Sequence, residues 1–509
     1  MIKSFNFRVI FALSVYLCTI IGSAPTFANL DNDKPLLRFM NTMSQKDIKI
    51  KGLDAYIQSL NENKSTLAEK GLLFLRKLQK LYYDHPWHLP KHLKATGLGV
   101  KAPANDLAFK DYQRNLMLQI REARIKGGMK GRQIVPEDLI AYRNAPFEMV
   151  DKTAPKAASG KYKRGILLIH GLQRTPFEMR SLGKHFRDKG FLVRSVLLPG
   201  HGTVPGDLVG VKAEEYIKTA EWGVSNLKKD AEDIYIAGYS TGGTLATYAA
   251  ETDPTIKGIF LISPALGFEK KATIAIHVTK HFRFLAKIFP KLKYRKILNE
   301  LDPYNYFTLP LSAAFAVNEL IKKTQNAISK HNRPYKIFYT GAMEDTTVNT
   351  EASFHYLGKK ALTVFKSKSR TDIDGILYSS AYSFDLHNWL QGQKLKNEGF
   401  KLKIKYITPE DLRKGIAMYS HTSLHIPPNH EEYGKDGLFP NCRHYPQYSQ
   451  KQILCRNFKP SDEEGQVLYG ERFGDLKDIF ILRRTTFNPQ YDEMLKRMTA
   501  YMEEHGIIP

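Results

Sequence analysis

Residues 233–250 (DIYIAGYSTGGTLATYAA) constrain the fold more than any other stretch of this chain. An apolar run at 234–237 breaks at Gly238-Tyr239-Ser240-Thr241-Gly242, and a Leu/Ala-rich segment with helical propensity follows directly. This order predicts a strand, a tight turn and a helix, with Ser240 at the apex. Glycine at 238 and 242 suits such a turn because no Cβ crowds the corner. The first N–H groups of the helix favour an oxyanion beside the serine, which makes Ser240 a candidate nucleophile.

The first 28 residues predict an export signal. Lys3 and Arg8 precede an uncharged run at 9–22, and Thr26-Phe27-Ala28 places small residues at the two positions that determine cleavage. We expect cleavage near Ala28 and a secreted or periplasmic protein, with an uncleaved membrane anchor as the alternative. The chain as a whole is 42% hydrophobic and 25% charged, which is typical of globular domains.

Two cysteines, Cys442 and Cys455, follow the predicted cleavage point. In an oxidising compartment this pair favours a disulfide, and closing so short a loop contributes about 3 kcal/mol. Two free thiols are the alternative. No other Cys/His cluster has the spacing of a zinc site, so we predict no structural metal.

The formal net charge is +25, and losing Lys3 and Arg8 with the signal would leave +23. A basic exported protein is suited to anionic lipid, cell-wall polymer or nucleic acid. The charge is spread along the chain and no nucleic-acid-binding motif is present, so we expect no nucleic-acid partner.

Residues 29–150 have the pattern of a helical N-terminal extension. Thr66-Leu67-Ala68-Glu69 is a capping box that opens a helical pattern reaching Tyr82, and a second helix is expected from Asp106 to Lys126, before Gly127-Gly128. Neither helix carries an evident catalytic set. We expect the extension to pack on the main domain.

From Lys163 onward, strand and helix patterns alternate, which predicts an α/β fold with a mostly parallel sheet covered by helices on both faces. Helices are expected at 177–189 and 213–229. The predicted strands are 165–170, 191–198, 234–237, 256–262, 335–339 and 401–407.

Two glycine-containing turns follow the first two strands. The first strand ends in His170-Gly171-Leu172, and the N–H of Leu172 is suited to meet that of Thr241 at one developing oxyanion. The second strand leads into Pro199-Gly200-His201-Gly202 at the rim of the site. We expect His170 and His201 to hold these turns rather than to react.

Together, His170-Gly171-Leu172, Pro199-Gly200-His201-Gly202 and the glycine-flanked Ser240 resemble the α/β-hydrolase superfamily. More narrowly they resemble the bacterial carboxylesterase, monoacylglycerol lipase and serine aminopeptidase group. The resemblance covers about 163–428. It implies a catalytic triad in the chain order serine, acid, histidine, and a cap inserted within the sheet domain.

The resemblance places the acid at Asp345. An aspartate three residues before a valine, after a strand and a glycine turn, is where the family keeps its carboxylate, and Asp345 precedes Val348 in this way. Its role would be to orient the histidine and to stabilise its cation. Glu344 is the competing acid.

The resemblance places the base at His421, on the turn after the strand predicted at 401–407. His425 is expected to be a supporting or surface histidine. The acid and the base are usually separated by a few tens of residues, whereas Asp345 and His421 are 76 apart. We therefore interpret 361–400 as an insertion, and keep His387 within it as an alternative base.

These assignments divide the chain. Residues 151–263 and 334–428 form the two parts of the hydrolase core, 264–333 a helical cap, and 429–509 a disulfide-stapled tail with a terminal helix at 488–505. Within the cap, 281–298 interleaves aromatic and basic residues. This stretch is suited either to an anionic membrane surface or to covering the pocket.

The function predicted from the sequence is an exported serine hydrolase of carboxylic esters, with lipid or monoacylglycerol-like esters as substrates and no cofactor or metal. A serine aminopeptidase is one alternative, and a non-catalytic envelope-associated binding protein is another. The sequence does not indicate the oligomeric state.

Overall fold

The computed structural model describes residues 89–509, except 132–133, 268–289, 332, 368–372, 381–399, 448, 459–466 and 472–480. The predicted signal peptide, the helix expected at 66–82 and the first half of the basic stretch at 281–298 lie outside the described residues. None of the helices that the structure describes has both the length and the apolar character needed to span a bilayer.

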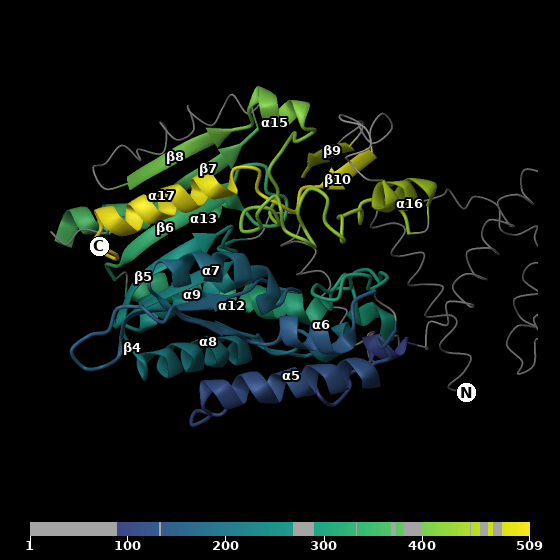
Figure 1. The fold of residues 1–509 in the computed structure, drawn as a ribbon, viewed down its shortest axis with the longest axis horizontal. Helices are drawn as coiled ribbons and strands as arrows, with labels where there is room; N and C mark the ends of the chain where they lie inside the picture. Colours follow the sequence, from purple (N-terminus) through teal and green to yellow (C-terminus); the bar gives the residue numbers. More distant parts are fainter. Residues whose placement is uncertain are drawn as a thin grey trace, which may run out of the picture. The chain divides into compact units, whose positions relative to one another are not determined.

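An eight-stranded sheet forms the centre of the protein, in the order β1-β3-β2-β4-β5-β6-β7-β8 (Figure 1). The short β1 runs antiparallel to β3, and every other neighbouring pair is parallel. The mostly parallel sheet predicted from the sequence is therefore confirmed. The strands are β1 Glu148–Met149, β2 Tyr162–Ile169, β3 Leu192–Val196, β4 Ala231–Tyr239, β5 Ile256–Ile262, β6 Lys336–Ala342, β7 Ile373–Ser379 and β8 Phe400–Tyr406.

Helices cover both faces of this sheet. The α-helices are α5 Phe109–Lys126, α6 Glu137–Asn144, α7 Arg180–Asp188, α8 Ala213–Lys228, α9 Thr241–Thr252, α12 Leu311–Lys330, α13 Thr350–Ser367, α15 Pro409–Arg413, α16 Gln450–Asn457 and α17 Tyr491–Glu504. Short 3₁₀ helices are η1 Lys91–Leu93, η2 Pro176–Met179, η3 Pro205–Leu208 and η4 Pro290–Lys293.

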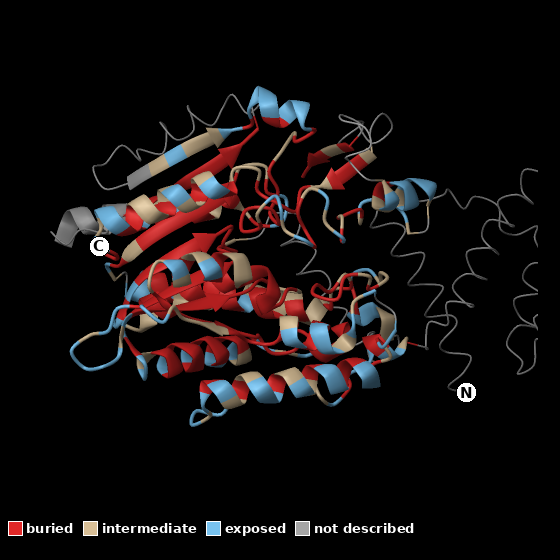
Figure 2. Cartoon of the chain, viewed as in Figure 1, coloured by how far each residue is buried: buried red, intermediate tan, exposed pale blue. Residues whose placement is uncertain are grey.

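The period-two alternation of the strands sorts their side chains into two apolar cores. In β4, Ile234 and Ile236 join the core beneath α8, α9 and α12, whereas Tyr235 and Ala237 join the core beneath α7 and α17. Figure 2 shows the central strands buried almost throughout, and the helices buried on their inner sides and exposed outside. A parallel sheet needs this double cover, because both of its faces are apolar.

The described part of the extension, from residue 89, and the terminal helix both pack on this domain. Helix α5 begins close to the residue expected, and Tyr112 on it lies against Trp222 of α8, with ring centroids 4.4 Å apart. The terminal helix expected at 488–505 is α17. It lies on the sheet face, where Tyr501 contacts Phe260 of β5 and Phe338 of β6.

Two segment assignments need correction. Residues 361–400 are not simply an insertion, because β7 lies within them and pairs with both β6 and β8. The region 264–333 is not all cap, because α12 packs against α9 and buries Val317 and Leu320 in the core. An amphipathic crossover helix and a helical cap have the same sequence period, so the pattern alone did not separate them.

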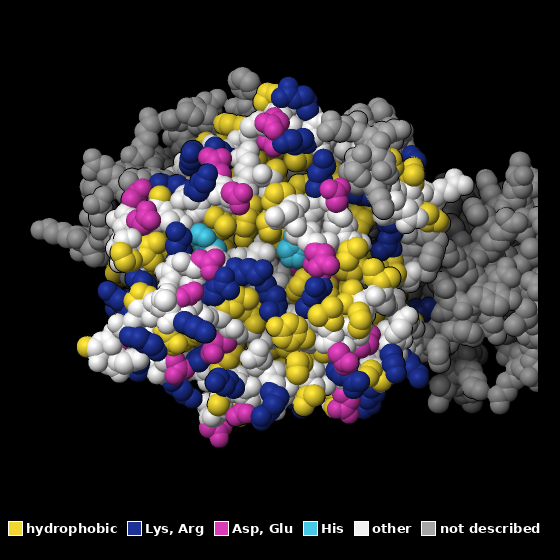
Figure 3. Space-filling view, viewed as in Figure 1, with side chains coloured by type: hydrophobic (Ala, Val, Ile, Leu, Met, Phe, Trp, Pro, Cys, Tyr) yellow, Lys and Arg dark blue, Asp and Glu magenta, His cyan; other side chains and the backbone are white. Residues whose placement is uncertain are grey.

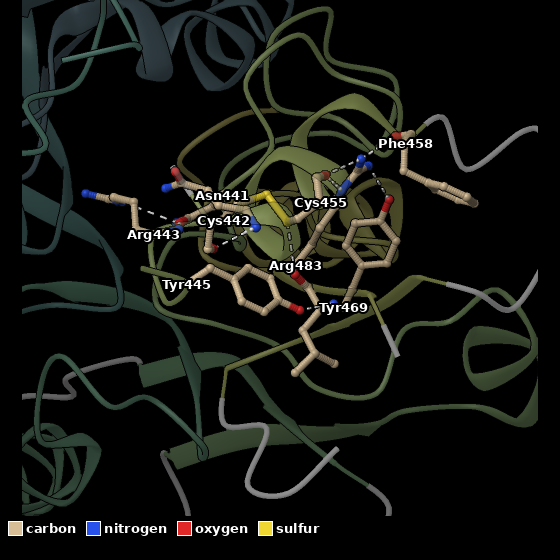
Figure 4. The surroundings of a disulfide bond; sticks show 11 residues. Asn441, Cys442, Arg443, Tyr445, Cys455, Phe458, Tyr469 and Arg483 are labelled. Atoms are coloured by element: carbon tan, nitrogen blue, oxygen red, sulfur yellow. Dashed lines mark hydrogen bonds between the residues drawn. A yellow bond between two sulfur atoms is a disulfide. The ribbon is translucent and has the colours of Figure 1, made fainter. Parts of the chain in front are cut away.

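The tail carries a small sheet of its own. Strands β9 Val467–Gly470 and β10 Ile481–Arg484 pair in parallel, and the predicted disulfide joins Cys442 to Cys455 beside them (Figure 4). The guanidinium of Arg483 in β10 donates two hydrogen bonds to the carbonyl of Cys455, at 3.0 and 2.8 Å. The disulfide is thus tied to the last strand of the tail.

Candidate active site

Ser240 occupies a strained turn between β4 and α9. Its φ is +53°, in the left-handed region that non-glycine residues rarely adopt. A Cβ at Gly238 would lie 2.2 Å from the carbonyl oxygen of Gly242, and a Cβ at Gly242 would lie 2.0 Å from that of Ile169. Only glycine fits at both positions. This turn presents the Ser240 hydroxyl at the carboxyl end of the central strand.

Three of the predicted side chains meet at this point. His421 Nε2 lies 3.0 Å from Ser240 Oγ, and His421 Nδ1 lies 2.6 Å from Asp345 Oδ2. All three residues are buried, each less than 8% exposed. With Nδ1–H donated to the carboxylate, Nε2 is left as the acceptor that faces the hydroxyl. The arrangement can move a proton from Ser240 to His421.

The loop after β6 presents Asp345 rather than Glu344. Asp345 Oδ1 accepts backbone hydrogen bonds from Thr347 (2.7 Å) and Val348 (2.9 Å), which leaves Oδ2 for the histidine. Glu344 Oε1 instead accepts from the backbone N–H (2.7 Å) and hydroxyl (2.8 Å) of Ser380. The two neighbouring acids therefore face different partners, and only Asp345 reaches His421.

His421 follows β8 and the short helix α15. Two parallel strands, β7 and β8, lie between the acid and the base, which accounts for the 76-residue separation. The alternative base, His387, falls within 381–399, outside the described residues.

His425 is completely buried, so the expectation that it is a surface histidine does not apply. Its Nε2 lies 3.2 Å from Glu178 Oε2, and its ring lies 4.1 Å from that of Tyr239. Burial lowers the pKa of His425, although the Glu178 carboxylate opposes this. It packs behind the Ser240 turn and does not contact the hydroxyl.

The two predicted oxyanion donors flank Ser240. Thr241 is the first residue of α9, and the turn before Leu172 lies against Ser240, since a Cβ at Gly171 would come within 3.2 Å of the serine Cβ. Within the described part of the chain, neither the Leu172 nor the Thr241 N–H has an acceptor. Both amides are therefore available to a bound oxyanion.

His170 and His201 hold the turn that carries Leu172. His170 Nε2 accepts from the Leu198 N–H, and His201 Nε2 accepts from the Gln173 N–H, both at 3.0 Å. Burial lowers the pKa of His170 well below its usual value and that of His201 to about 4. Both rings are therefore neutral acceptors near pH 7, in agreement with the structural role expected of them.

A comparison with known protein families finds a match that includes the Ser240 turn. A family model described as "Serine aminopeptidase, S33" matches residues 160–329, which include β2 to β5 and the whole of the turn. The chain has the α/β-hydrolase fold, and residues 160–329 are similar to this family.

Two curated relatives are named as a lipase and an esterase. The chain is 37% identical over 102 residues to a thermostable monoacylglycerol lipase of Bacillus sp. (strain H-257), covering 20% of this chain and 41% of the lipase. It is 26% identical over 191 residues to a carboxylesterase of Bacillus subtilis (strain 168), covering 37% of this chain and 75% of the esterase. The chain thus matches less than half of the length of the first relative.

Among solved structures, a monoacylglycerol lipase of Paleococcus ferrophilus matches with 19% identity and a TM-score of 0.34, covering 51% of this chain and 88% of the lipase. The family match ends at residue 329, so Ser240 lies inside it, whereas Asp345 and His421 lie beyond it.

Sequence reasoning missed two charged residues next to the loop that carries Asp345. Glu471 and Arg484, from the tail, contact the two threonines that follow Asp345. No local pattern indicated them, because their partners are more than 100 positions away along the chain. Only a long-range contact could have identified them.

On the visible face of the described residues, the other charges do not gather in one patch. On the face seen in Figure 3, lysine and arginine side chains are interspersed with acidic and apolar ones. Among the described residues, no group of three or more His, Cys, Asp or Glu side chains is placed to hold a metal ion.

Proposed function

We propose that this α/β-hydrolase is an exported serine hydrolase that cleaves carboxylic esters with Ser240 as nucleophile, His421 as base and Asp345 as orienting carboxylate. The observation that carries the proposal is the position of His421, which lies within hydrogen-bond distance of both other side chains. The similarity to a monoacylglycerol lipase and a carboxylesterase supports the reaction class.

In the first half of the reaction, Ser240 Oγ bonds to the ester carbonyl carbon while its proton passes to His421 Nε2. The carbonyl oxygen gains negative charge, which the N–H groups of Leu172 and Thr241 stabilise. Removing one such donor typically costs about 10²–10³ in rate. Asp345 holds Nδ1–H and stabilises the imidazolium.

The tetrahedral intermediate then collapses, and the bond between the acyl carbon and the alcohol oxygen breaks. His421 Nε2 returns the proton to that oxygen, so the alcohol leaves neutral and the acyl group stays on Ser240. Water then attacks the acyl carbon, His421 takes its proton, and the same donors hold the second oxyanion. The bond between the acyl carbon and Ser240 Oγ then breaks, Oγ takes the proton back from His421 Nε2, and the carboxylic acid is released.

Lipid esters, including monoacylglycerol-like esters, are the proposed substrates. Leu172 packs against an apolar cluster of Leu208, Tyr306 and Ala313, so the turn that carries this proposed oxyanion donor borders apolar side chains. Such surroundings suit an acyl chain better than a polar one. Contact of 281–298 with an anionic membrane surface belongs to the same proposal.

Export is supported by the signal-like first 28 residues and by the disulfide. A cystine that joins Cys442 to Cys455 is expected to persist in an oxidising compartment such as the periplasm or the medium.

The aminopeptidase alternative is not favoured. Binding a free amine requires an available carboxylate, and two buried acids before α12, Asp302 and Glu300, are engaged internally. Asp302 accepts from the Tyr433 hydroxyl and the Tyr304 N–H, and Glu300 accepts from the N–H groups of Phe307 and Thr308. Burial also raises the pKa of both carboxyls to about 7, which weakens them as amine ligands.

The test is hydrolysis of p-nitrophenyl esters of short to long acyl chains by the mature protein, beside Ser240→Ala, Asp345→Asn, His421→Ala and His387→Ala. We expect the first three variants to lose several orders of magnitude in kcat and His387→Ala to keep its activity. If no ester is hydrolysed and an organophosphate does not label Ser240, the proposal is wrong, and the binding-protein alternative takes its place.

A further inference from the structure

The small sheet of the tail contacts the loop that carries Asp345. Glu471, just after β9, accepts hydrogen bonds from the Thr346 N–H at 3.1 Å and from the Thr346 hydroxyl. Arg484, at the end of β10, binds both oxygens of Glu471 at 2.6 Å and donates to the Thr347 hydroxyl at 2.9 Å. Two charged side chains therefore hold the two residues that directly follow the acid.

The same end of β10 contacts the loop that carries His421. The carbonyl oxygen of Thr485, next to Arg484, accepts from the hydroxyls of Ser420 and Thr422, the two neighbours of His421. The Thr485 hydroxyl donates to the Met418 carbonyl at 2.8 Å. Two consecutive residues thus connect the acid loop and the base loop to one rigid strand.

The contact between Glu471 and Arg484 has a geometry that requires arginine. The Glu471 side chain is fully buried, and its two oxygens meet the guanidinium in the paired geometry that only arginine offers. Burial disfavours the Arg484 cation, but the carboxylates of Glu471 and Asp345 outweigh this and raise the pKa of Arg484. Arg484 therefore stays charged, and the Asp345 carboxylate stabilises its cation in addition to Glu471.

The disulfide completes the support. Asn441, next to Cys442, accepts from the Arg484 N–H at 3.0 Å, and the carbonyl of Cys455 accepts from Arg483. Figure 4 shows Arg483 beside the cystine and its bonds to the Cys455 segment. All of these residues lie outside the family match at 160–329.

We propose that Glu471 and Arg484 are positioning residues, which hold Asp345 in place through the threonines at 346 and 347 and thereby keep His421, its hydrogen-bond partner, in register with Ser240. This inference rests on the proposed esterase function. A shift of about 1 Å in a catalytic group can cost about 10²-fold in rate. Loss of the contacts that hold the two catalytic loops should therefore lower kcat. Substrate binding depends on other surfaces, so KM is expected to change little.

The sharpest test is the double variant Thr346→Val/Thr347→Val. Both threonines are exposed, and valine keeps their shape and charge while removing the hydroxyl bonds to Glu471 and Arg484. The bond from the backbone N–H of residue 346 to Glu471 stays. We expect kcat for a p-nitrophenyl ester to fall at least tenfold with KM within about threefold. The pH profile of kcat should also change, because a displaced Asp345 no longer holds the His421 ring in the same position.

Two charged variants extend the test. Glu471→Gln should also lower kcat, and Arg484→Lys should lower it because lysine keeps the charge but not the two-pronged contact. The matched control is Glu148→Gln, which breaks a similar pair with Arg194 (2.7 Å) at the opposite edge of the sheet. We expect the control to affect thermal stability but neither kcat nor the pH profile.

The outcomes separate the two proposals. If the wild-type protein hydrolyses esters and Ser240→Ala does not, while the double valine variant keeps its kcat and its pH profile, the positioning role is overturned and the esterase proposal stands. If the wild-type protein hydrolyses no ester, the esterase proposal fails first. A loss of kcat equal to that of Glu148→Gln, with an unchanged pH profile, would also overturn the positioning role.

Discussion

Ser240 and His421 lie 181 positions apart in the sequence, yet Oγ of one is 3.0 Å from Nε2 of the other. The serine is held by the turn between β4 and α9, and the histidine by a loop that hydrogen-bonds to the tail. Their distance therefore depends on two separately built supports, and each support can be disturbed independently of the other.

Asp345→Asn should lower kcat by roughly 10⁴, because an amide in place of the carboxylate favours the wrong tautomer of the histidine. Steady-state kinetics with a p-nitrophenyl ester measures the effect. Glu344→Gln is the neighbouring control, and we expect it to retain most of the activity, since Glu344 faces Ser380. Equal losses in both variants would contradict the assignment of Asp345.

Gly242→Ala should prevent folding of the nucleophile turn, because the new Cβ would lie 2.0 Å from a backbone oxygen. Gly210→Ala is the comparison. That glycine has a φ of +88°, but no atom lies within 4 Å of the position that a Cβ would take, so only backbone strain of roughly 1 kcal/mol is expected there. Urea unfolding measures both, and similar losses would show that crowding at the turn is unimportant.

Reduction of the Cys442–Cys455 disulfide should lower the free energy of unfolding by about 3 kcal/mol. If the tail positions the catalytic loops, kcat should fall as well, even at temperatures where the reduced protein is still folded. Thermal unfolding and ester hydrolysis of Cys442→Ser/Cys455→Ser test both effects. An unchanged kcat in a folded double variant would mean that the tail keeps its position without the cystine.

The buried His201 should make the fold sensitive to acid. Burial lowers its pKa to about 4, whereas a histidine in an unfolded chain titrates near 6.5. Between these values the unfolded chain binds a proton that the folded protein does not. Its contribution to stability is therefore complete above pH 6.5 and is lost as the pH falls towards 4, by at most about 1.4 kcal/mol per pH unit.

His201→Gln tests this pH dependence. Glutamine can still accept from the Gln173 N–H, but it does not titrate. We expect the free energy of unfolding of the variant to fall less steeply between pH 6.5 and 5 than that of the wild type, measured by urea denaturation. Identical slopes would show that His201 contributes nothing to acid sensitivity.

Strand β7 shows why part of the fold could not be predicted. Its sequence contains Asp374 and Gly375, which are unusual inside a central strand. The structure compensates Asp374 with Arg497 of α17, 123 positions away, and uses Gly375 where a Cβ would lie 2.0 Å from the Tyr339 carbonyl. Both compensations are tertiary, so the local pattern indicated an insertion instead of a strand.

The sequence by itself determined the strand-turn-helix around Ser240, the parallel sheet and the pairing of the two tail cysteines as expectations, because glycine placement, hydrophobic period and cysteine count act locally. The choice between Asp345 and Glu344 came from a resemblance, and the tertiary structure alone decides which of these adjacent carboxylates faces a histidine. It also decided that His425 is buried and that Glu471 and Arg484 hold the acid loop. Contacts between residues more than 100 positions apart depend on how the finished sheet brings its loops together, and no local pattern records that.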